Sequence, residues 1–183
     1  REILSVFSTI KWMKKLNVPV FYSPDHQLHK PKYEYDCGLQ IPYQEIPRRI
    51  ESARNCLNSL SFTEEIQPEK NLTLDQITKI HSRDLITHLQ KQSKLADQQG
   101  ARPGEKELYL YPWIYPLNSQ MAAKLKNSPD AAGCYAFDTY APIGKHTWQA
   151  VYASANLAAN AAQSVVLGQT SLAYALCRPP GHH

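Results

Sequence analysis

Two adjacent histidines, His182 and His183, are the residues of this chain best suited to proton-transfer chemistry. They follow Arg178-Pro179-Pro180-Gly181, in which the prolines restrict the backbone and the glycine allows close approach of a ligand. An imidazole has an ordinary pKa of ~6.5, so neighbouring imidazoles can take up and release protons near neutral pH. The pattern therefore predicts a paired acid and base, with a chance pair or a tag remnant as the alternative.

The other histidines offer weaker chemistry. His26 and His29 lie three residues apart in a proline-flanked turn. A metal site there would need further ligands in a suitable geometry, so we interpret both as ordinary surface histidines. His81 and His88 lie seven residues apart in a helical region, where packing or capping is the expected role.

Asp138 is the best-placed candidate acid to accompany the tandem histidines. It could contact a substrate, or it could serve as a turn or cap residue. The patterns of other enzyme classes are absent. The seven glycines form no dinucleotide-binding loop, phosphate-binding loop or nucleophile elbow, and there is no HExxH metal motif.

A short apolar strand is expected to hold the tandem histidines. Residues 171–177 are almost all apolar, and they follow a helix predicted for residues 147–167 with Thr147 as its N-terminal cap and Gly168 just past its end. A run of this kind is typical of a strand buried on both faces of a parallel sheet. Ligands of such sheets bind beyond the carboxyl ends of the strands, where residues 178–183 lie.

The N-terminal half supplies further elements of an α/β protein. Residues 18–22 are predicted to form a strand that ends in a turn, and Pro47 opens a helix with one apolar face. Further helix starts are predicted at Thr73, which forms a capping-box pattern with Gln76, and at Ser82. Together with the C-terminal elements they predict the α/β class.

Residues 97–146 differ from the rest of the chain. Glycine, proline and aromatic residues concentrate there, including Tyr109, Tyr111, Trp113 and Tyr115, and a short helix is expected only at residues 121–125. A long segment of this kind is often functional or part of an interface, and its rings need burial. An irregular excursion packed on its own domain is the alternative.

The composition of the chain limits which classes of protein and which partners are plausible. The chain has 183 residues, 43% of them hydrophobic and 20% charged, which fits one globular domain. The net charge of +4 is too scattered to argue for nucleic acid, and no apolar run is long enough for a membrane helix. Four cysteines without a CxxC pair suggest a reducing, cytoplasmic location. Residues 1–17 are predicted to be an N-terminal extension, either a packed or frayed helix or a targeting segment.

Several segments of this chain resemble the zinc-dependent histone deacetylase family, in particular its acetylpolyamine amidohydrolase branch. The active-site segment Ala175–His183 carries the most specific likeness. The agreement extends, in order, to residues 21–26, residues 45–50, residues 80–86 and the alanine-rich residues 147–162. The resemblance spans most of residues 18–183.

The resemblance implies an arginase/deacetylase-like three-layer α/β fold with a central parallel sheet, incomplete in this chain. It also implies a catalytic Zn²⁺ in the full-length protein. In the family, the metal ligands are two aspartates and a histidine. A tyrosine that is not a ligand helps to polarise the substrate carbonyl. All four residues follow the tandem histidines in the chain. None of these positions is present in residues 1–183, so no metal ligand is assigned. The chain also has Tyr43-Gln44-Glu45 where the family usually has His-Pro-Glu.

By the same resemblance, His183 is the expected general base and His182 its electrostatic partner. A substrate contact by Asp138 is not part of what the resemblance implies, and a turn or cap role stays open for it. The expected reaction removes acetyl groups from acetylated polyamines or acetyl-lysine. The insertion at about residues 97–146 is expected to form a homodimer and to narrow the entrance to the site. No nucleic-acid or membrane partner is expected. The alternative is that these 183 residues are a catalytically inactive N-terminal fragment or a binding module.

Overall fold

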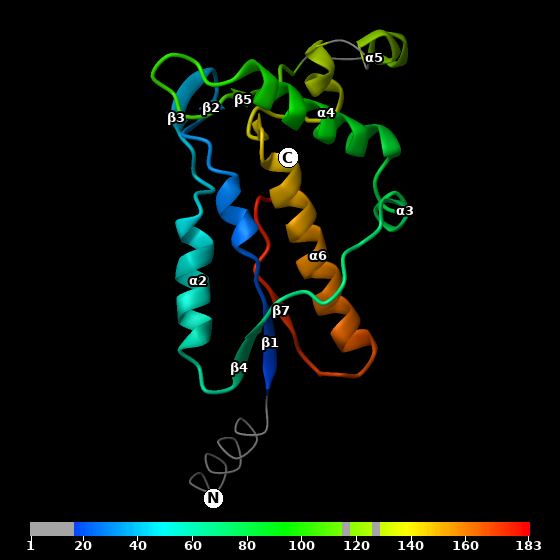
Figure 1. Cartoon of the computed structure of the whole chain (residues 1–183). Coiled ribbons are helices and arrows are strands. Elements are labelled where there is room, and N and C mark those ends of the chain that lie inside the picture. The colour runs from blue at the N-terminus through cyan, green and yellow to red at the C-terminus, as the bar shows by residue number, and fades with distance from the viewer. Residues whose placement is uncertain (1–16, 115–117, 126–128) are drawn as a thin grey trace, which may run out of the picture.

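A three-stranded parallel sheet lies at the centre of the computed structural model, which describes residues 17–114, 118–125 and 129–183. One helix lies on each side of the sheet: α2 (Arg48–Asn58) on one side and α6 (Thr147–Val166) on the other (Figure 1). This arrangement confirms the predicted three-layer α/β architecture. The N-terminal extension predicted for residues 1–17 lies outside the described residues, apart from Asn17.

The central strand is β1 (Val18–Phe21), which confirms the strand predicted at residues 18–22. It pairs in parallel with β4 (Thr63–Ile66) along one edge and with β7 (Tyr174–Ala175) along the other. Because successive side chains of a strand point to opposite faces, β1 contributes to two cores. The first contains Val20, Tyr22, Leu176 and the α2 side chains Ile50, Ala53 and Leu57. The second contains Phe21 and the α6 side chains Leu157 and Ala161.

The predicted helix starts are largely confirmed. The Thr73 side chain accepts from the Gln76 backbone N–H, and the Gln76 side chain accepts from the Thr73 N–H, so the capping box opens the short helix α3 (Leu74–Ile77). Ser82 caps α4 (Arg83–Gln99) through the Leu85 N–H. The short helix predicted at residues 121–125 is α5 (Ser119–Leu125).

Two details of the C-terminal elements correct the sequence analysis. His146, not Thr147, is the cap residue of α6, and Thr147 is its first helical residue. The strand predicted over residues 171–177 shortens to the two residues of β7. Tyr174 is 49% exposed, so β7 is not buried on both faces as predicted. Its place at the edge of the described sheet explains this exposure.

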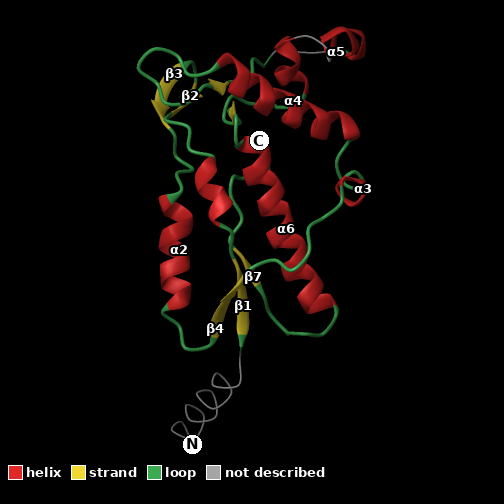
Figure 2. Ribbon diagram, viewed as in Figure 1, coloured by secondary structure: helices red, strands yellow, loops and turns green. Residues whose placement is uncertain are grey.

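A β-hairpin that the sequence analysis did not predict lies at the upper end of the molecule, beside α4 (Figure 2). It consists of β2 (Tyr33–Asp36) and β3 (Leu39–Pro42). Cys37 and Gly38 form its two-residue turn with φ values of 48° and 81°, and positive φ at both positions is what a tight hairpin turn requires. The short helix η1 (Pro24–Leu28) connects β1 to this hairpin.

The segment predicted to be irregular, residues 97–146, contains more regular elements than the predicted short helix. β5 (Tyr109–Leu110) pairs in antiparallel register with β6 (Ile143–Gly144), and η2 (Pro129–Cys134) lies between α5 and β6. The Tyr115 ring falls outside the described residues.

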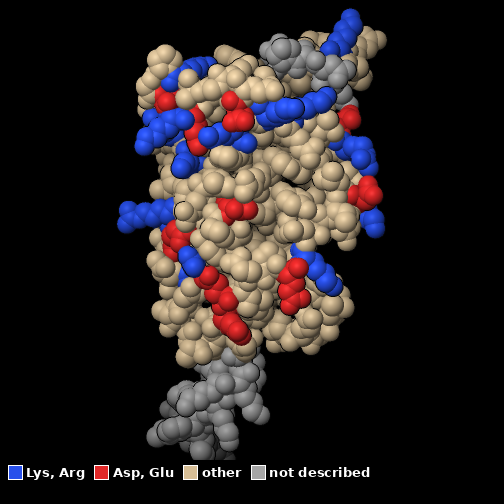
Figure 3. Space-filling model, in the orientation of Figure 1, with Lys and Arg blue, Asp and Glu red and all other residues tan. Residues whose placement is uncertain are grey.

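On the face drawn in Figure 3, basic side chains gather around the hairpin and α4, with acidic side chains among them. No helix in the described part of the chain is long and apolar enough to cross a membrane.

Candidate functional site

The structure brings His183 and Asp138 into direct contact. His183 Nδ1 lies 2.5 Å from Asp138 Oδ2, and both side chains are about three-quarters buried. The second carboxylate oxygen of Asp138 accepts the Tyr140 backbone N–H at 2.9 Å. Both oxygens of Asp138 are therefore engaged, which fixes the direction from which the carboxylate meets the imidazole.

This contact decides which nitrogen of His183 can act as a base. An ionised carboxylate only accepts hydrogen bonds, so we assign the hydrogen of the neutral ring to Nδ1, which donates a hydrogen bond to Asp138 Oδ2. In the described part of the chain, Nε2 has no hydrogen-bond partner, and in this tautomer it can accept a proton. The exposed ring of His182 lies beside it, with ring centroids 4.1 Å apart and planes inclined at 47°.

A pocket of about 220 Å³ opens beside His183. Its walls come from the hairpin, from the residues after the hairpin, from Tyr140 and from the tandem-histidine segment. The lining residues are Glu34, Tyr43, Gln44, Glu45, Tyr140, Pro180 and His183. Glu34 is only 5% exposed, and burial raises the pKa of Tyr43 to about 12, so this phenol stays protonated. Carboxylates together with tyrosine rings form an environment that suits a cation.

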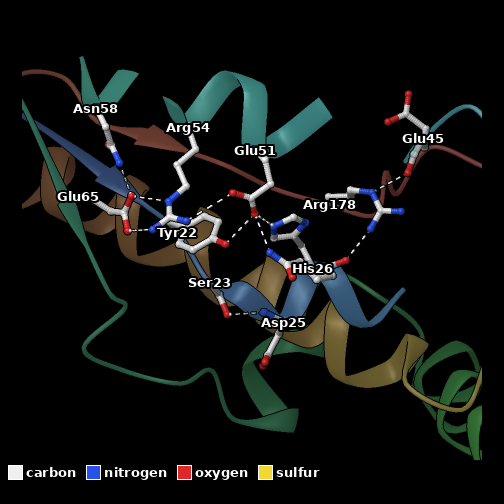
Figure 4. A network of polar contacts seen from close by, with 11 residues as sticks. Tyr22, Ser23, Asp25, His26, Glu45, Glu51, Arg54, Asn58, Glu65 and Arg178 are labelled. Atoms are coloured by element: carbon white, nitrogen blue, oxygen red, sulfur yellow. Dashed lines mark hydrogen bonds and ion pairs between the residues drawn. The ribbon is translucent and has the colours of Figure 1, made fainter. Parts of the chain in front are cut away.

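Arg178 fixes the start of the tandem-histidine segment. Its side chain is 2% exposed; Nε donates to the Glu45 carbonyl at 2.6 Å and Nη1 donates to the His26 carbonyl at 2.5 Å (Figure 4). These bonds connect the end of β7 to η1 and to the segment that precedes α2. A charge-assisted hydrogen bond to a carbonyl is stronger than a neutral one, so Arg178 holds three parts of the chain together.

His26 and His29 correct the sequence analysis, because both are buried, with 2% of their surface exposed. His29 uses both ring nitrogens: Nδ1 lies 2.9 Å from Thr147 Oγ1 and Nε2 lies 3.2 Å from the Tyr43 hydroxyl. Burial, with Arg178 nearby, lowers the pKa of His29 to about 3, so the ring stays neutral. The turn folds as η1 against α6, which removes these histidines from solvent.

His26 belongs to a polar network between η1 and α2 (Figure 4). Its Nε2 lies 2.9 Å from Glu51 Oε1, which also accepts the Tyr22 hydroxyl and the Gln27 amide. Burial alone would raise the pKa of Glu51, but these hydrogen bonds and one from Arg54 lower it to about 2. The residues of this network therefore stabilise the junction of β1 with α2 and lie outside the pocket lining.

The remaining histidines of the helical region have separate roles. His88 is buried and stacks on Tyr135 with ring centroids 4.4 Å apart, which confirms the predicted packing role. His81 is exposed after α3. Neither residue lines the pocket beside His183.

His183 and Asp138 were predicted from the sequence, whereas Glu34 and Tyr140 are pocket residues that were not. Glu34 lies in Tyr33-Glu34-Tyr35-Asp36, where tyrosines alternate with acidic residues just before the Cys37-Gly38 turn. That alternation and the turn were the available signal for a hairpin with one buried face. The described residues contain no group of three or more His, Cys, Asp or Glu side chains that could hold a metal ion.

Comparison with known proteins places these features in context. The histone deacetylase domain profile matches residues 43–183. Acetylpolyamine amidohydrolase 2 of Pseudomonas aeruginosa is 32% identical over 162 residues, which cover 88% of this chain and 45% of that protein. The chain thus spans less than half the length of the curated relatives it matches.

Two solved structures have the same fold. The crystal structure of acetylpolyamine aminohydrolase from Burkholderia pseudomallei superimposes with a TM-score of 0.74 at 26% identity, covering 91% of this chain and 46% of that one. The HD domain of HDA15 superimposes with a TM-score of 0.60 at 17% identity, covering 92% and 36%. These likenesses confirm the predicted arginase/deacetylase-like fold, of which the chain contains a part.

Proposed function

Because this chain belongs to the histone deacetylase family, we propose that the full-length protein hydrolyses the N-acetyl amide of small cationic amines to acetate and the free amine. The observation that carries the proposal is the pocket beside His183. It combines a histidine whose Nε2 can accept a proton with the carboxylates of Glu34 and Glu45. Proton transfer and cation binding are the two tasks that this substrate class demands.

In this proposal His183 is the general base. Nε2 takes a proton from the attacking water and returns it to the leaving amine, while Asp138 holds Nδ1–H and stabilises the imidazolium formed between these steps. His182 is its electrostatic partner, since the two rings are adjacent. Asp138 acts here through His183, and the substrate contact expected for it remains a prediction.

The family also implies Zn²⁺, but the described residues do not form a site for it. Asp138 and His183 are bonded to each other, and no described group of three ligands exists. No step is therefore assigned to a metal on these residues. We propose that the full-length protein requires zinc and that its ligands lie outside them, since a catalytic zinc site needs about three protein ligands.

Glu34 is the residue we assign to the cationic end of the substrate. A buried carboxylate stabilises an ammonium ion far better than a solvent-exposed one, because water screens it less. The tyrosine rings of the same pocket add attraction for a cation. We propose slender acetylated polyamines as the first substrate class and acetyl-lysine on a protein as the second.

The test is a deacetylation assay on the zinc-loaded, full-length protein. Acetylputrescine and its neutral isostere N-pentylacetamide form a matched pair that differs in the ammonium group alone. We expect a higher kcat/KM for acetylputrescine, and we expect Glu34→Gln to raise KM for acetylputrescine but not for the neutral isostere. Absence of turnover of both acetylputrescine and an acetyl-lysine peptide would refute the proposed function.

A second candidate is that residues 1–183 by themselves are an inactive unit or a binding module. The absence of a metal-ligand cluster among the described residues favours it. Metal analysis and the same assay on residues 1–183 test this candidate. Stoichiometric zinc with turnover would eliminate it.

We also propose a homodimer formed through residues 97–146. A groove of about 1000 Å³ lies between this segment and the hairpin, and its aromatic lining includes Tyr33, Tyr35, Tyr111 and Trp113. Trp113 is 74% exposed, and aromatic residues are enriched at protein interfaces. Light scattering at micromolar concentration should give a dimer that Trp113→Asp weakens; a monomer in the wild type would contradict the proposal.

For the protein's location we propose the cytoplasm, which the four free cysteines support.

A further inference from the structure

Four consecutive residues, 137–140, hold His183 on one side and the hairpin on the other; we call this segment the clasp. On the histidine side, the Phe137 N–H donates to the His183 carbonyl at 3.4 Å and Asp138 binds the imidazole. On the hairpin side, the Thr139 hydroxyl donates to the Tyr35 carbonyl. The clasp is therefore the physical connection between β2 and the candidate base.

The outer anchor of the clasp is a hydrogen bond between two side chains. The Tyr140 hydroxyl donates to Asp36 Oδ1 at 2.6 Å. This bond raises the pKa of Tyr140 to about 12, so the phenol remains a donor at neutral pH. Asp36 is the last residue of β2, immediately before the Cys37-Gly38 turn, and it lies outside the pocket lining.

Tyr140 is bonded through both its backbone and its side chain. Its N–H donates to Asp138 Oδ1, and its hydroxyl is held by Asp36. Its ring also lies 5.5 Å from the His183 ring, so the tyrosine stands between the hairpin and the imidazole. When Asp36 holds the hydroxyl, the Tyr140 N–H keeps one carboxylate oxygen of Asp138 and leaves the other for His183.

We propose that Asp36 is a positioning residue for the candidate base. It acts through Tyr140 and Asp138 to keep the proton of His183 on Nδ1, so that Nε2 stays unprotonated. The effect on the tautomer follows from the contacts of the clasp alone. Its effect on turnover rests on the function proposed above.

The tautomer is tested on the full-length protein by NMR with ¹⁵N-labelled histidine. Spectra are recorded at about pH 8, above the ordinary pKa of histidine, and His183→Gln identifies the resonances of this ring. We expect the wild type to hold Nδ1–H and Asp36→Leu and Tyr140→Phe to shift part of the population to Nε2–H. Asp36→Asn retains an oxygen that can accept from Tyr140 and should keep the wild-type tautomer.

A merely structural role would give a different result. The Asp36–Tyr140 hydrogen bond is exposed to solvent, so its loss should leave the melting temperature almost unchanged. If Asp36→Leu keeps the wild-type tautomer, the inference is overturned. If it shifts the tautomer only together with a large loss of melting temperature, a general loosening of the hairpin explains the result and the inference is likewise overturned.

The kinetic consequence is measured on the zinc-loaded, full-length protein. Asp36→Leu should lower kcat about five- to tenfold with little change in KM, Asp36→Asn should restore most of the loss, and Asp36→Leu combined with Tyr140→Phe should be no slower than Tyr140→Phe alone. An unchanged kcat in Asp36→Leu would overturn the inference. No turnover in the wild type, with the tautomer shift still observed, would refute the proposed function and leave the positioning role standing.

Discussion

Two histidines of this chain, His29 and His183, are held in opposite ways. His29 is buried and both of its ring nitrogens are hydrogen-bonded, one to Thr147 and one to Tyr43. His183 is partly exposed, its Nδ1 is bonded to Asp138, and its Nε2 has no partner in the described structure. The first arrangement locks a neutral ring between α6 and the residues after β3. The second orients a ring and leaves one nitrogen for a ligand.

The difference shows how the same side chain can serve stability in one place and chemistry in another. Bonding both nitrogens removes the capacity to exchange protons with a substrate, and burial favours the neutral ring. Bonding one nitrogen to a carboxylate sets the tautomer while the other nitrogen stays accessible. Substitutions at the two positions should therefore affect different measurements.

The largest expected effect is on turnover. In the full-length protein, His183→Ala should lower kcat by about 10²-fold or more, as loss of a general acid–base does, while zinc content and melting temperature change little. His81→Ala is the matched control, because His81 is exposed and does not line the pocket beside His183. Normal turnover in His183→Ala would show that the base has been assigned to the wrong residue.

The next effect concerns stability and pH. The pKa of His29 falls from 6.5 to about 3 on folding, so between these values the unfolded chain binds a proton that the folded chain does not. The contribution of neutral His29 to the unfolding free energy is fully present above pH 6.5. As the pH falls from 6.5 towards 3, the unfolding free energy decreases by about 1.4 kcal/mol for each pH unit.

His29→Gln removes this titration. Between pH 7 and pH 5, its unfolding free energy should fall by about 2 kcal/mol less than that of the wild type. His26 and His88, whose pKa values are also lowered by burial, are present in both proteins and cancel in the comparison. Urea unfolding at the two pH values provides the measurement. Equal losses in both proteins would mean that His29 is not buried as described.

The smallest effect is expected at Phe137, which lies beside His183 and outside the pocket lining. Phe137 is 72% exposed, and its ring centroid lies 6.5 Å from that of His183. Phe137→Ala keeps the backbone bond to His183 and should change the unfolding free energy by no more than about 0.5 kcal/mol. Denaturant titration checks this expectation. A loss of several kcal/mol would place Phe137 with the core rather than with the site.

Local sequence signals predicted much of the fold. The capping box at Thr73, the cap at Ser82 and the apolar face after Pro47 depend on neighbours within a few residues, and all three are present in the structure. His182 and His183 were identified for the same reason, since proline, glycine and histidine in sequence restrict the local backbone. Their catalytic roles remain predictions.

Contacts between distant residues account for what was missed. The burial of His29 requires Thr147, which lies 118 residues away, and the place of Tyr140 depends on Asp36, 104 residues away. No periodicity within a short window contains such pairs. The hairpin is a different case, because the positive φ of Cys37 is unusual for a residue other than glycine and the Cys-Gly pair is a weak turn signal.

The contacts of Arg178 also bear on how the chain reaches its folded state. Its Nη1 donates to a carbonyl 152 residues earlier, and β7 pairs with the first strand of the sheet. Contacts of such sequence separation slow folding, because a long loop must close before they form. On the ribosome, β1, α2 and β4 can assemble as an early unit, and one edge of β1 stays open until Tyr174 and Ala175 emerge. That open edge presents unpaired backbone N–H and C=O groups, which can pair with another chain until β7 covers them.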